Sequence, residues 1–194
     1  MSRSIYLAGP EVFLPNAKEQ GEAKKALCQR YGFSGLYPLD NELDESITSS
    51  QYAQALAWAI SAGNEQLIQQ ADVIIANLTP FRGASADVGT VYELGLARGL
   101  NKTLLGYSND PRLFVDRTKA LFAPAEPAFD LNGDEIMMDR DGLAIENFEL
   151  HDNLMIEGGI RLAQGCFLTH ETALAERLTD LSAFEALLRW LVEH

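Results

Sequence analysis

The sequence predicts an α/β protein with a Rossmann-like or flavodoxin-like three-layer fold and a mainly parallel sheet. Short apolar runs of strand length alternate along the chain with longer segments in which apolar residues recur at helical spacing. The run 72–78 is short, β-branched and almost continuously apolar, which is typical of a strand that helices cover on both faces. Strands that alternate with helices pair in parallel through right-handed crossovers.

The expected elements can be placed in order from the N-terminus. Short β-prone runs predict strands at 5–8, 33–39, 72–78 and 103–107. Helical spacing predicts helices at 16–30, 46–70, 86–99, 153–163 and 173–192, with Gly63 as a candidate interruption of the second and the last as a C-terminal amphipathic helix. Such sheets bind ligands beyond the carboxyl ends of their strands, where the strand order reverses. The segments 9–13 and 79–93 should therefore face one crevice.

Residues 110–148 break the alternation and hold three of the seven prolines. Within them, 135–138 and 142–145 flank Asp139-Arg140-Asp141, which predicts a β-hairpin. We interpret 110–148 as an insertion or flap of a single domain that spans residues 1–194, because 194 residues is an ordinary length for one domain.

The charge balance excludes two classes of partner. The chain has 15 lysines and arginines against 28 aspartates and glutamates, a formal net charge of −13. This acidity disfavours binding to nucleic acid and to anionic membrane surfaces, which both depend on clustered basic residues. No signal-peptide pattern or apolar run of membrane-spanning length is present, and the two cysteines lack CxxC spacing. We therefore expect a cytoplasmic protein with no nucleic-acid or membrane partner.

The segment 83–95 carries the strongest chemical signal. Asp87 stands where a helix is expected to begin, so its plainest interpretation is an N-cap. Glu93 follows six residues later, near the same helix face, and apolar neighbours should partly bury it. Partial burial of a carboxylate is costly without a partner. We therefore favour a functional role for Glu93 in the crevice, although a solvated or salt-bridged glutamate is the alternative.

The remaining motifs narrow the chemistry. The three histidines are scattered, and no P-loop, GxGxxG or GxSxG pattern occurs, so we expect no metal and no cofactor. A carboxylate nucleophile that acts without either is typical of glycosyl transfer. Tyr6, near the end of the first strand, could donate a hydrogen bond to such a carboxylate, or could simply be a half-buried strand residue.

Four blocks of sequence together resemble one family. They are Tyr6-Leu7-Ala8-Gly9-Pro10 with Phe13, then 72–78, then Asp87-Val88-Gly89-Thr90 with Glu93-Leu94-Gly95, and finally Asn153-Leu154-Met155. In this order they resemble the nucleoside 2-deoxyribosyltransferases, over residues 5 to about 156. The combination is more specific than any block alone. The insertion and the C-terminal helix exceed the smallest members of the family, so the resemblance does not interpret them.

The resemblance implies transfer of 2-deoxyribose between nucleobases through a covalent deoxyribosyl-enzyme intermediate. Glu93 matches the nucleophile of the family and Tyr6 the tyrosine that orients it. Asp87 matches the aspartate that binds the sugar 5′-hydroxyl. Asn153 matches an asparagine that reaches this hydroxyl from a neighbouring subunit, and Met155 a methionine that contacts the sugar. A homo-oligomer with shared sites is implied, although Asn153 has a helix N-cap as its alternative role.

The expected base pocket departs from some family members. Asn64 stands where a base-contacting aspartate occurs in well-known members, and Glu42 where a glutamine occurs. Gly9 and Phe13 also match the family pattern. Asp40, with Asn41 beside it, could reach the crevice after the second strand or form a turn. The substrates implied are purine or pyrimidine 2′-deoxynucleosides and free bases, and the base preference is left open. The proton donor is also left open, since Asn64 cannot donate a proton to a leaving base.

Two other functions remain open from the sequence. One is a related hydrolase that cleaves 2′-deoxynucleoside 5′-monophosphates, which would need donors for a dianionic phosphate. Asp87 with Asn153 suits a neutral 5′-hydroxyl better, and Arg82 is the only basic residue in its loop. The other is a non-catalytic nucleoside-binding module on the same fold.

Overall fold

The computed structural model of the chain describes residues 2–41, 53–122, 128–129, 131–133 and 135–194. Five strands form one sheet in the order β2-β1-β3-β4-β7, and every pair is parallel. They are β1 (Ser4–Ala8), β2 (Ser34–Leu36), β3 (Val73–Asn77), β4 (Thr103–Ser108) and β7 (Cys166–Thr169). This order is that of flavodoxin-like sheets. The predicted fold class is therefore confirmed.

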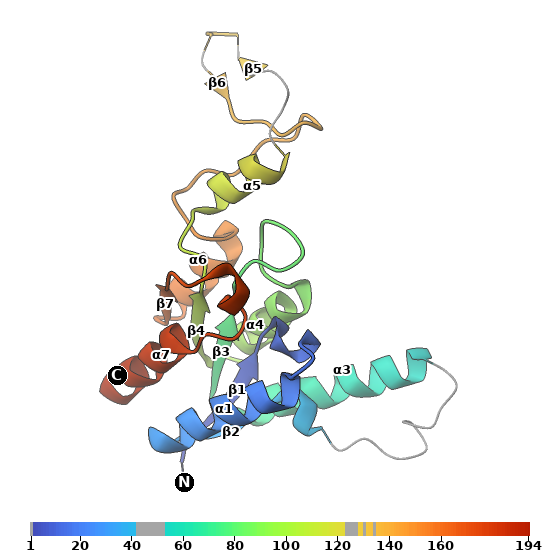
Figure 1. The fold of residues 1–194 in the computed structure, drawn as a ribbon, viewed down its shortest axis with the longest axis vertical. Coiled ribbons are helices and arrows are strands. Elements are labelled where there is room, and N and C mark those ends of the chain that lie inside the picture. The colour runs from blue at the N-terminus through green and yellow to red at the C-terminus, as the bar shows by residue number, and fades with distance from the viewer. Residues whose placement is uncertain (1, 42–52, 123–127, 130, 134) are drawn as a thin grey trace.

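Helices cover both faces of the sheet (Figure 1). The first face packs on α1 (Ala17–Arg30) and α7 (Ser182–Glu193), and the second on α3 (Ala53–Gln70), α4 (Val88–Gly99) and α6 (Leu154–Leu162). Side chains alternate along each strand, so Ile5 and Leu7 enter the first core and Tyr6 and Ala8 the second. Tyr6 therefore faces the layer that contains α4.

The strand order reverses between β1 and β3. The two strands are in register from Ile5 opposite Val73 to Ala8 opposite Ala76, so their carboxyl ends lie at one level. The segments that follow them do meet, as predicted: Phe13 of η1 (Pro10–Phe13) stacks on Phe81 with 5.3 Å between ring centroids.

The inserted segment begins with a helix that the sequence pattern did not predict, α5 (Phe114–Phe122). The expected hairpin is present as an antiparallel bridge between Met138 and Ala144, but β6 (Glu135–Ile136) pairs instead with β5 (Ala128–Phe129). In Figure 1, β5 and β6 lie at the far end of the molecule from the sheet.

Three other elements differ from expectation. Strand β7 was not predicted, because it is a four-residue edge strand that is only half-buried and lacks a β-branched run. The last helix begins at Ser182 rather than at 173, because the Asp180 carboxylate accepts the Ser182 N–H at 2.8 Å, and only the short η3 (Leu174–Glu176) precedes it. Helix α3 continues through Gly63, while residues 46–52 of its expected span lie outside the described residues.

None of the helices in the described parts of the chain has the length and apolar character needed to cross a membrane.

A buried ionic cluster joins η1, which follows β1, to α1, β3 and β4. The carboxylate of Glu11 accepts hydrogen bonds from the Lys24 ammonium, from Asn77 Nδ2 at 2.9 Å and from the Tyr107 hydroxyl at 3.1 Å. All four residues are buried. The chain passes so close to them that a Cβ atom at Gly9 would lie 2.8 Å from Cβ of Asn77. The cluster therefore fixes the turn after β1 and explains the glycine there.

We expect Lys24→Met to lower the free energy of unfolding by about 3–5 kcal/mol, because it leaves the buried Glu11 carboxylate without its counter-charge. Urea denaturation measures this effect. The matched control is Lys25→Met in the same helix, whose ion pairs with Glu22 at 2.8 Å and Asp40 at 2.9 Å lie near the surface; it should cost less than about 1 kcal/mol. Equal losses in the two variants would contradict the assignment.

Candidate active site

Tyr6 and Glu93 lie together at the switch point of the sheet. The Tyr6 hydroxyl donates a hydrogen bond of 2.6 Å to Oε1 of Glu93. Tyr6 is fully buried in β1, and Glu93 is half-buried on the second turn of α4. The strand thus supplies a rigid donor, and the helix presents the carboxylate to it.

Asn64 approaches the same oxygen from α3. Its Nδ2 lies 3.5 Å from Oε1 of Glu93, and its Oδ1 accepts a hydrogen bond of 2.7 Å from Nδ2 of Asn41. Because this bond fixes the amide, the NH₂ group of Asn64 points toward Glu93. Asn41 fits here because Gly63 has no side chain: a Cβ atom there would lie 2.9 Å from Cγ of Asn41.

The environment of Glu93 disfavours its ionised form. Burial raises the pKa of the Glu93 carboxyl to about 7, whereas the hydrogen bond from Tyr6 lowers it and the negative charges of Asp87 and Glu11 raise it. Burial, together with the charge of Glu93, raises the pKa of the Tyr6 phenol, so Tyr6 keeps its proton and acts as a donor. A carboxyl group with a pKa near neutrality is typical of acid–base and nucleophilic sites.

Asp87 is the N-cap of α4. Its Oδ2 accepts the Thr90 N–H at 2.9 Å and the Thr90 hydroxyl at 3.1 Å. Within the described parts of the chain, no hydrogen bond reaches its Oδ1. The capping interpretation is therefore correct, and one carboxylate oxygen remains for a ligand.

Two cavities flank α4. A cavity of about 240 Å³ between α3 and α4 is lined by Asn64, Glu93 and their neighbours. A larger apolar cavity of about 740 Å³ lies between α4 and α6 and is lined by Asn153 and Met155. Within one chain, the structure therefore brings Glu93, Tyr6, Asn64 and Asp87 together but leaves Asn153 and Met155 on the opposite face of α4.

Asn153 is held by the end of the insertion. Its Oδ1 caps α6 by accepting the Met155 N–H at 3.0 Å, and its Nδ2 donates to Oε2 of Glu146 at 2.8 Å. Met155 itself is 74% exposed. Oε1 of Glu146 also accepts the Leu154 N–H at 2.6 Å. Glu146 carries no sequence signal, because it lies in an irregular segment.

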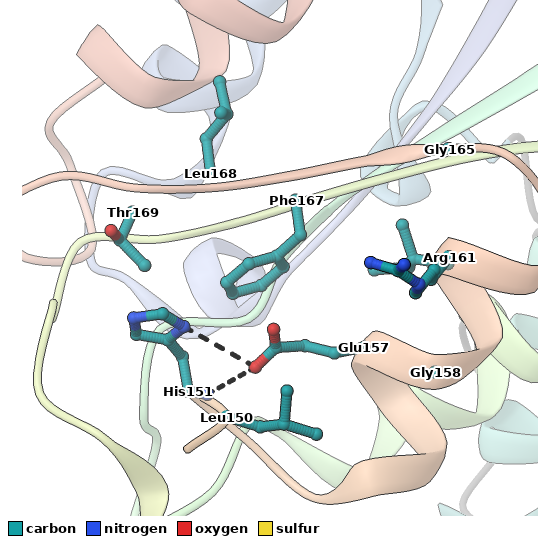
Figure 2. A pocket seen from close by; sticks show the side chains of 10 residues that line it. Leu150, His151, Glu157, Gly158, Arg161, Gly165, Phe167, Leu168 and Thr169 are labelled. Carbon is teal, nitrogen blue, oxygen red and sulfur yellow. Dashed lines mark hydrogen bonds and ion pairs between the residues drawn. The ribbon is translucent and has the colours of Figure 1, made fainter. Parts of the chain in front are cut away.

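A third cavity, of about 600 Å³, lies beside the edge strand β7 (Figure 2). His151 stacks on Phe167 there, with ring centroids 5.7 Å apart, and Glu157 lies beside His151. It contains none of the site residues predicted from the sequence.

The remaining predicted residues have separate places. Phe13 is 56% exposed and packs on Phe81, and the Arg82 guanidinium lies 5.2 Å from the Phe13 ring centroid. Asp40 forms the turn after β2: its carboxylate accepts the Tyr37 N–H at 3.1 Å, so it does not reach Glu93. Glu42 lies outside the described residues.

No group of three or more His, Cys, Asp or Glu residues within the described ranges is arranged to hold a metal ion.

The fold and the site define the class of protein: a flavodoxin-like α/β protein with a tyrosine-bound carboxylate at its ligand-binding edge. The sequence profile of the nucleoside 2-deoxyribosyltransferase family matches residues 5–155, so the chain belongs to this family. The structure of a 2-deoxyribosyltransferase from Leishmania mexicana is similar, at 31% identity and a TM-score of 0.64, over 99% of this chain and 98% of that one.

Two further proteins are similar to this chain. An uncharacterized protein of Schizosaccharomyces pombe is 32% identical over 167 residues, which is 83% of this chain and 78% of the relative. A structure described as a conserved protein from Enterococcus faecalis has a TM-score of 0.54 at 16% identity, over 98% of this chain and 99% of that one, and shares the fold.

We expect the Glu93 carboxyl to titrate with a pKa of about 7, as followed by NMR of its labelled carboxyl carbon. Tyr6→Phe removes the hydrogen bond that favours the ionised form, so the midpoint should move to higher pH. Asp87→Asn removes a negative charge that disfavours the ionised form, so the midpoint should move to lower pH. Shifts of the same sign in both variants would contradict this electrostatic account.

Proposed function

We propose that the protein transfers 2-deoxyribose between nucleobases through a covalent deoxyribosyl ester on Glu93. The observation that carries this proposal is the placement of Glu93 in a chain of this family: it is held at 2.6 Å by Tyr6 beside a cavity, with no cation among its described partners.

The two oxygens of Glu93 have different environments. Both hydrogen bonds that it accepts from described residues, from Tyr6 and from Asn64, end on Oε1. Oε2 is therefore the oxygen that attacks C1′ of the sugar. Because a 2-deoxy sugar lacks the electron-withdrawing 2′-hydroxyl, its oxocarbenium-like transition state is accessible to a carboxylate without a metal.

Each half-reaction exchanges one bond at C1′. In the first, the bond between C1′ and the base nitrogen breaks, the base leaves with the electron pair and takes up a proton, and the ester to Glu93 forms. In the second, a different base attacks C1′, loses its proton and releases the Glu93 carboxylate. Both half-reactions use one site, so ping-pong kinetics follow.

The sugar is positioned by residues from two cavities. We assign the unused Oδ1 of Asp87 to the 5′-hydroxyl. Asn153 and Met155 line the other face of α4, which supports their contribution to the site of a neighbouring subunit in a homo-oligomer. The exposure of Met155 agrees with a partner there.

The base occupies the side of Glu93 nearer to α3. Asn64 offers an amide in place of a carboxylate, and Phe13, stacked on Phe81, supplies an aromatic surface. We propose purine or pyrimidine 2′-deoxynucleosides and free bases as substrates.

The contacts around the site disfavour the alternative function, the hydrolysis of 2′-deoxynucleoside 5′-monophosphates. The hydroxyl of Ser85, a candidate phosphate donor beside the site, is already donated to the Asp152 carboxylate. The charges of Asp87 and Glu93 repel a dianion. A neutral nucleoside is the better substrate.

The test is incubation with 2′-deoxyinosine and adenine, with deoxyadenosine measured by liquid chromatography. We expect the wild type to form it, and Glu93→Ala to lower kcat about 10³-fold or more, because the nucleophile is lost. 2′-Deoxyinosine 5′-monophosphate should be the poorer donor. Absence of transfer with any base pair, or preferential cleavage of the monophosphate, would overturn the proposal.

A further inference from the structure

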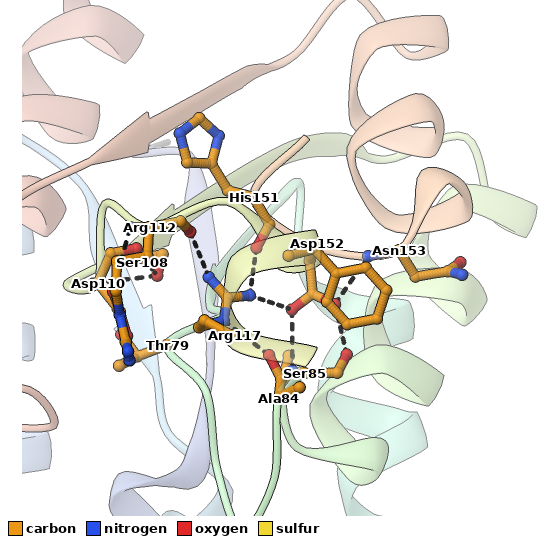
Figure 3. Close-up of polar contacts among 12 residues, drawn as sticks. Thr79, Ala84, Ser85, Ser108, Asp110, Arg112, Arg117, His151, Asp152 and Asn153 are labelled. Carbon is orange, nitrogen blue, oxygen red and sulfur yellow. Dashed lines mark hydrogen bonds and ion pairs between the residues drawn. The ribbon is translucent and has the colours of Figure 1, made fainter. Parts of the chain in front are cut away.

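Arg117 of α5 is buried at the base of the inserted segment, with 2% of its surface exposed. Its guanidinium donates to three backbone carbonyls: Nε to Ala84 at 2.7 Å, Nη1 to Arg112 at 2.6 Å, and Nη2 to His151 (Figure 3). One of these carbonyls lies just before α4 and another just before α6.

Asp152 complements Arg117 with bonds to donors from the same two segments. Its Oδ1 accepts the Ser85 hydroxyl and the Asn153 N–H, the latter at 2.8 Å. Its Oδ2 accepts the Ala86 N–H at 2.9 Å and lies 3.8 Å from Nη2 of Arg117. Asp152 is 1% exposed. Together the two side chains join residues 84–86 to residues 151–153.

A buried ion pair of this kind contributes little to the net stability of the fold, but it fixes the positions of the groups to which it is hydrogen-bonded. Removing two charges from water costs about as much as their attraction returns, so apolar residues of similar size would stabilise the fold equally well. The directed hydrogen bonds, by contrast, fix six backbone and hydroxyl groups in one arrangement. Asn153 carries one of these groups, and Asp87 follows Ala86, which carries another.

We propose that Arg117 and Asp152 are positioning residues, which hold the N-terminal ends of α4 and α6 so that Asp87 can bind the sugar 5′-hydroxyl in its own site and Asn153 can bind it in the site of a neighbouring subunit. This inference rests on the proposed function. On this proposal the inserted segment contributes to the site through α5, which lies at its base. The distant β5–β6 hairpin has no part in this role.

The experiment compares two donors, 2′-deoxyinosine and 2′,5′-dideoxyinosine, which lacks the 5′-hydroxyl. The ratio of their kcat/KM values measures how strongly the enzyme uses that hydroxyl. We expect Asp152→Asn, which cannot accept all of its present bonds, to lower this ratio about tenfold. Arg117→Lys should act in the same direction, because an ammonium cannot reproduce the three-way contact.

Asp110→Asn is the matched control. Asp110 is also fully buried and pairs with arginines, with Arg112 at 2.6 Å and with Arg177 at 3.0 Å, but its carboxylate bonds to neither helix terminus. It should leave the ratio of the two donors unchanged even if it lowers stability. Ser85→Ala removes one hydroxyl contact to Asp152 and provides a milder variant, expected to lower the ratio by a smaller factor.

The possible results separate the two claims. A wild-type enzyme that transfers no deoxyribose overturns the proposed function and this role with it. If the wild type is active but the ratio of kcat/KM values for the two donors is unchanged in Asp152→Asn and Ser85→Ala, the positioning role alone is overturned. A fall of the ratio in Asp110→Asn equal to that in Asp152→Asn also overturns it, since the effect would then be a general loss of packing.

Discussion

The organisation of the site depends on one hydrogen bond, from the Tyr6 hydroxyl to Oε1 of Glu93. It forms because residues alternate along β1, so Tyr6 faces the helices of one layer while Ile5 and Leu7 face the other. The parallel register of β1 and β3 then sets α4 beside the strand. A shift of either strand by one residue would point Tyr6 away from Glu93. The Glu93 carboxylate is thus positioned by the core of the protein and not by a flexible loop.

Three buried or half-buried carboxylates have different partners, and the difference separates the two that hold the fold together from the candidate catalytic one. Glu11 forms an ion pair with Lys24, and Asp152 forms one with Arg117, so a positive charge balances each of these carboxylates where it holds loops together. Glu93 receives only the neutral donors Tyr6 and Asn64 from the described residues, and burial, together with neighbouring negative charges, raises its pKa. A carboxylate that is poorly stabilised as an anion is more basic, which suits the nucleophilic role that we propose for Glu93.

The sequence was sufficient to predict the fold class, because strand alternation and the helix after β3 leave regular patterns. The pairing of Tyr6 with Glu93 followed from the family resemblance, since the pattern alone left Tyr6 open as an ordinary strand residue. The sequence was insufficient for β7, which is a short edge strand, and for α5, a nine-residue helix inside a segment that breaks the alternation of strands and helices. Asp40 is a turn residue because Lys25 and the Tyr37 N–H occupy its carboxylate. Arg117 and Asp152 carried no signal, since their partners are distant in sequence and mostly backbone groups that any residue type supplies.

The most direct test of the account is intact-protein mass spectrometry after acid quenching of the enzyme with a 2′-deoxynucleoside and no acceptor base. The account predicts a mass increase of one deoxyribosyl group, located on Glu93 by peptide mapping and absent from Glu93→Gln. Efficient transfer by the wild type without any adduct, or with the adduct on another residue, would contradict it.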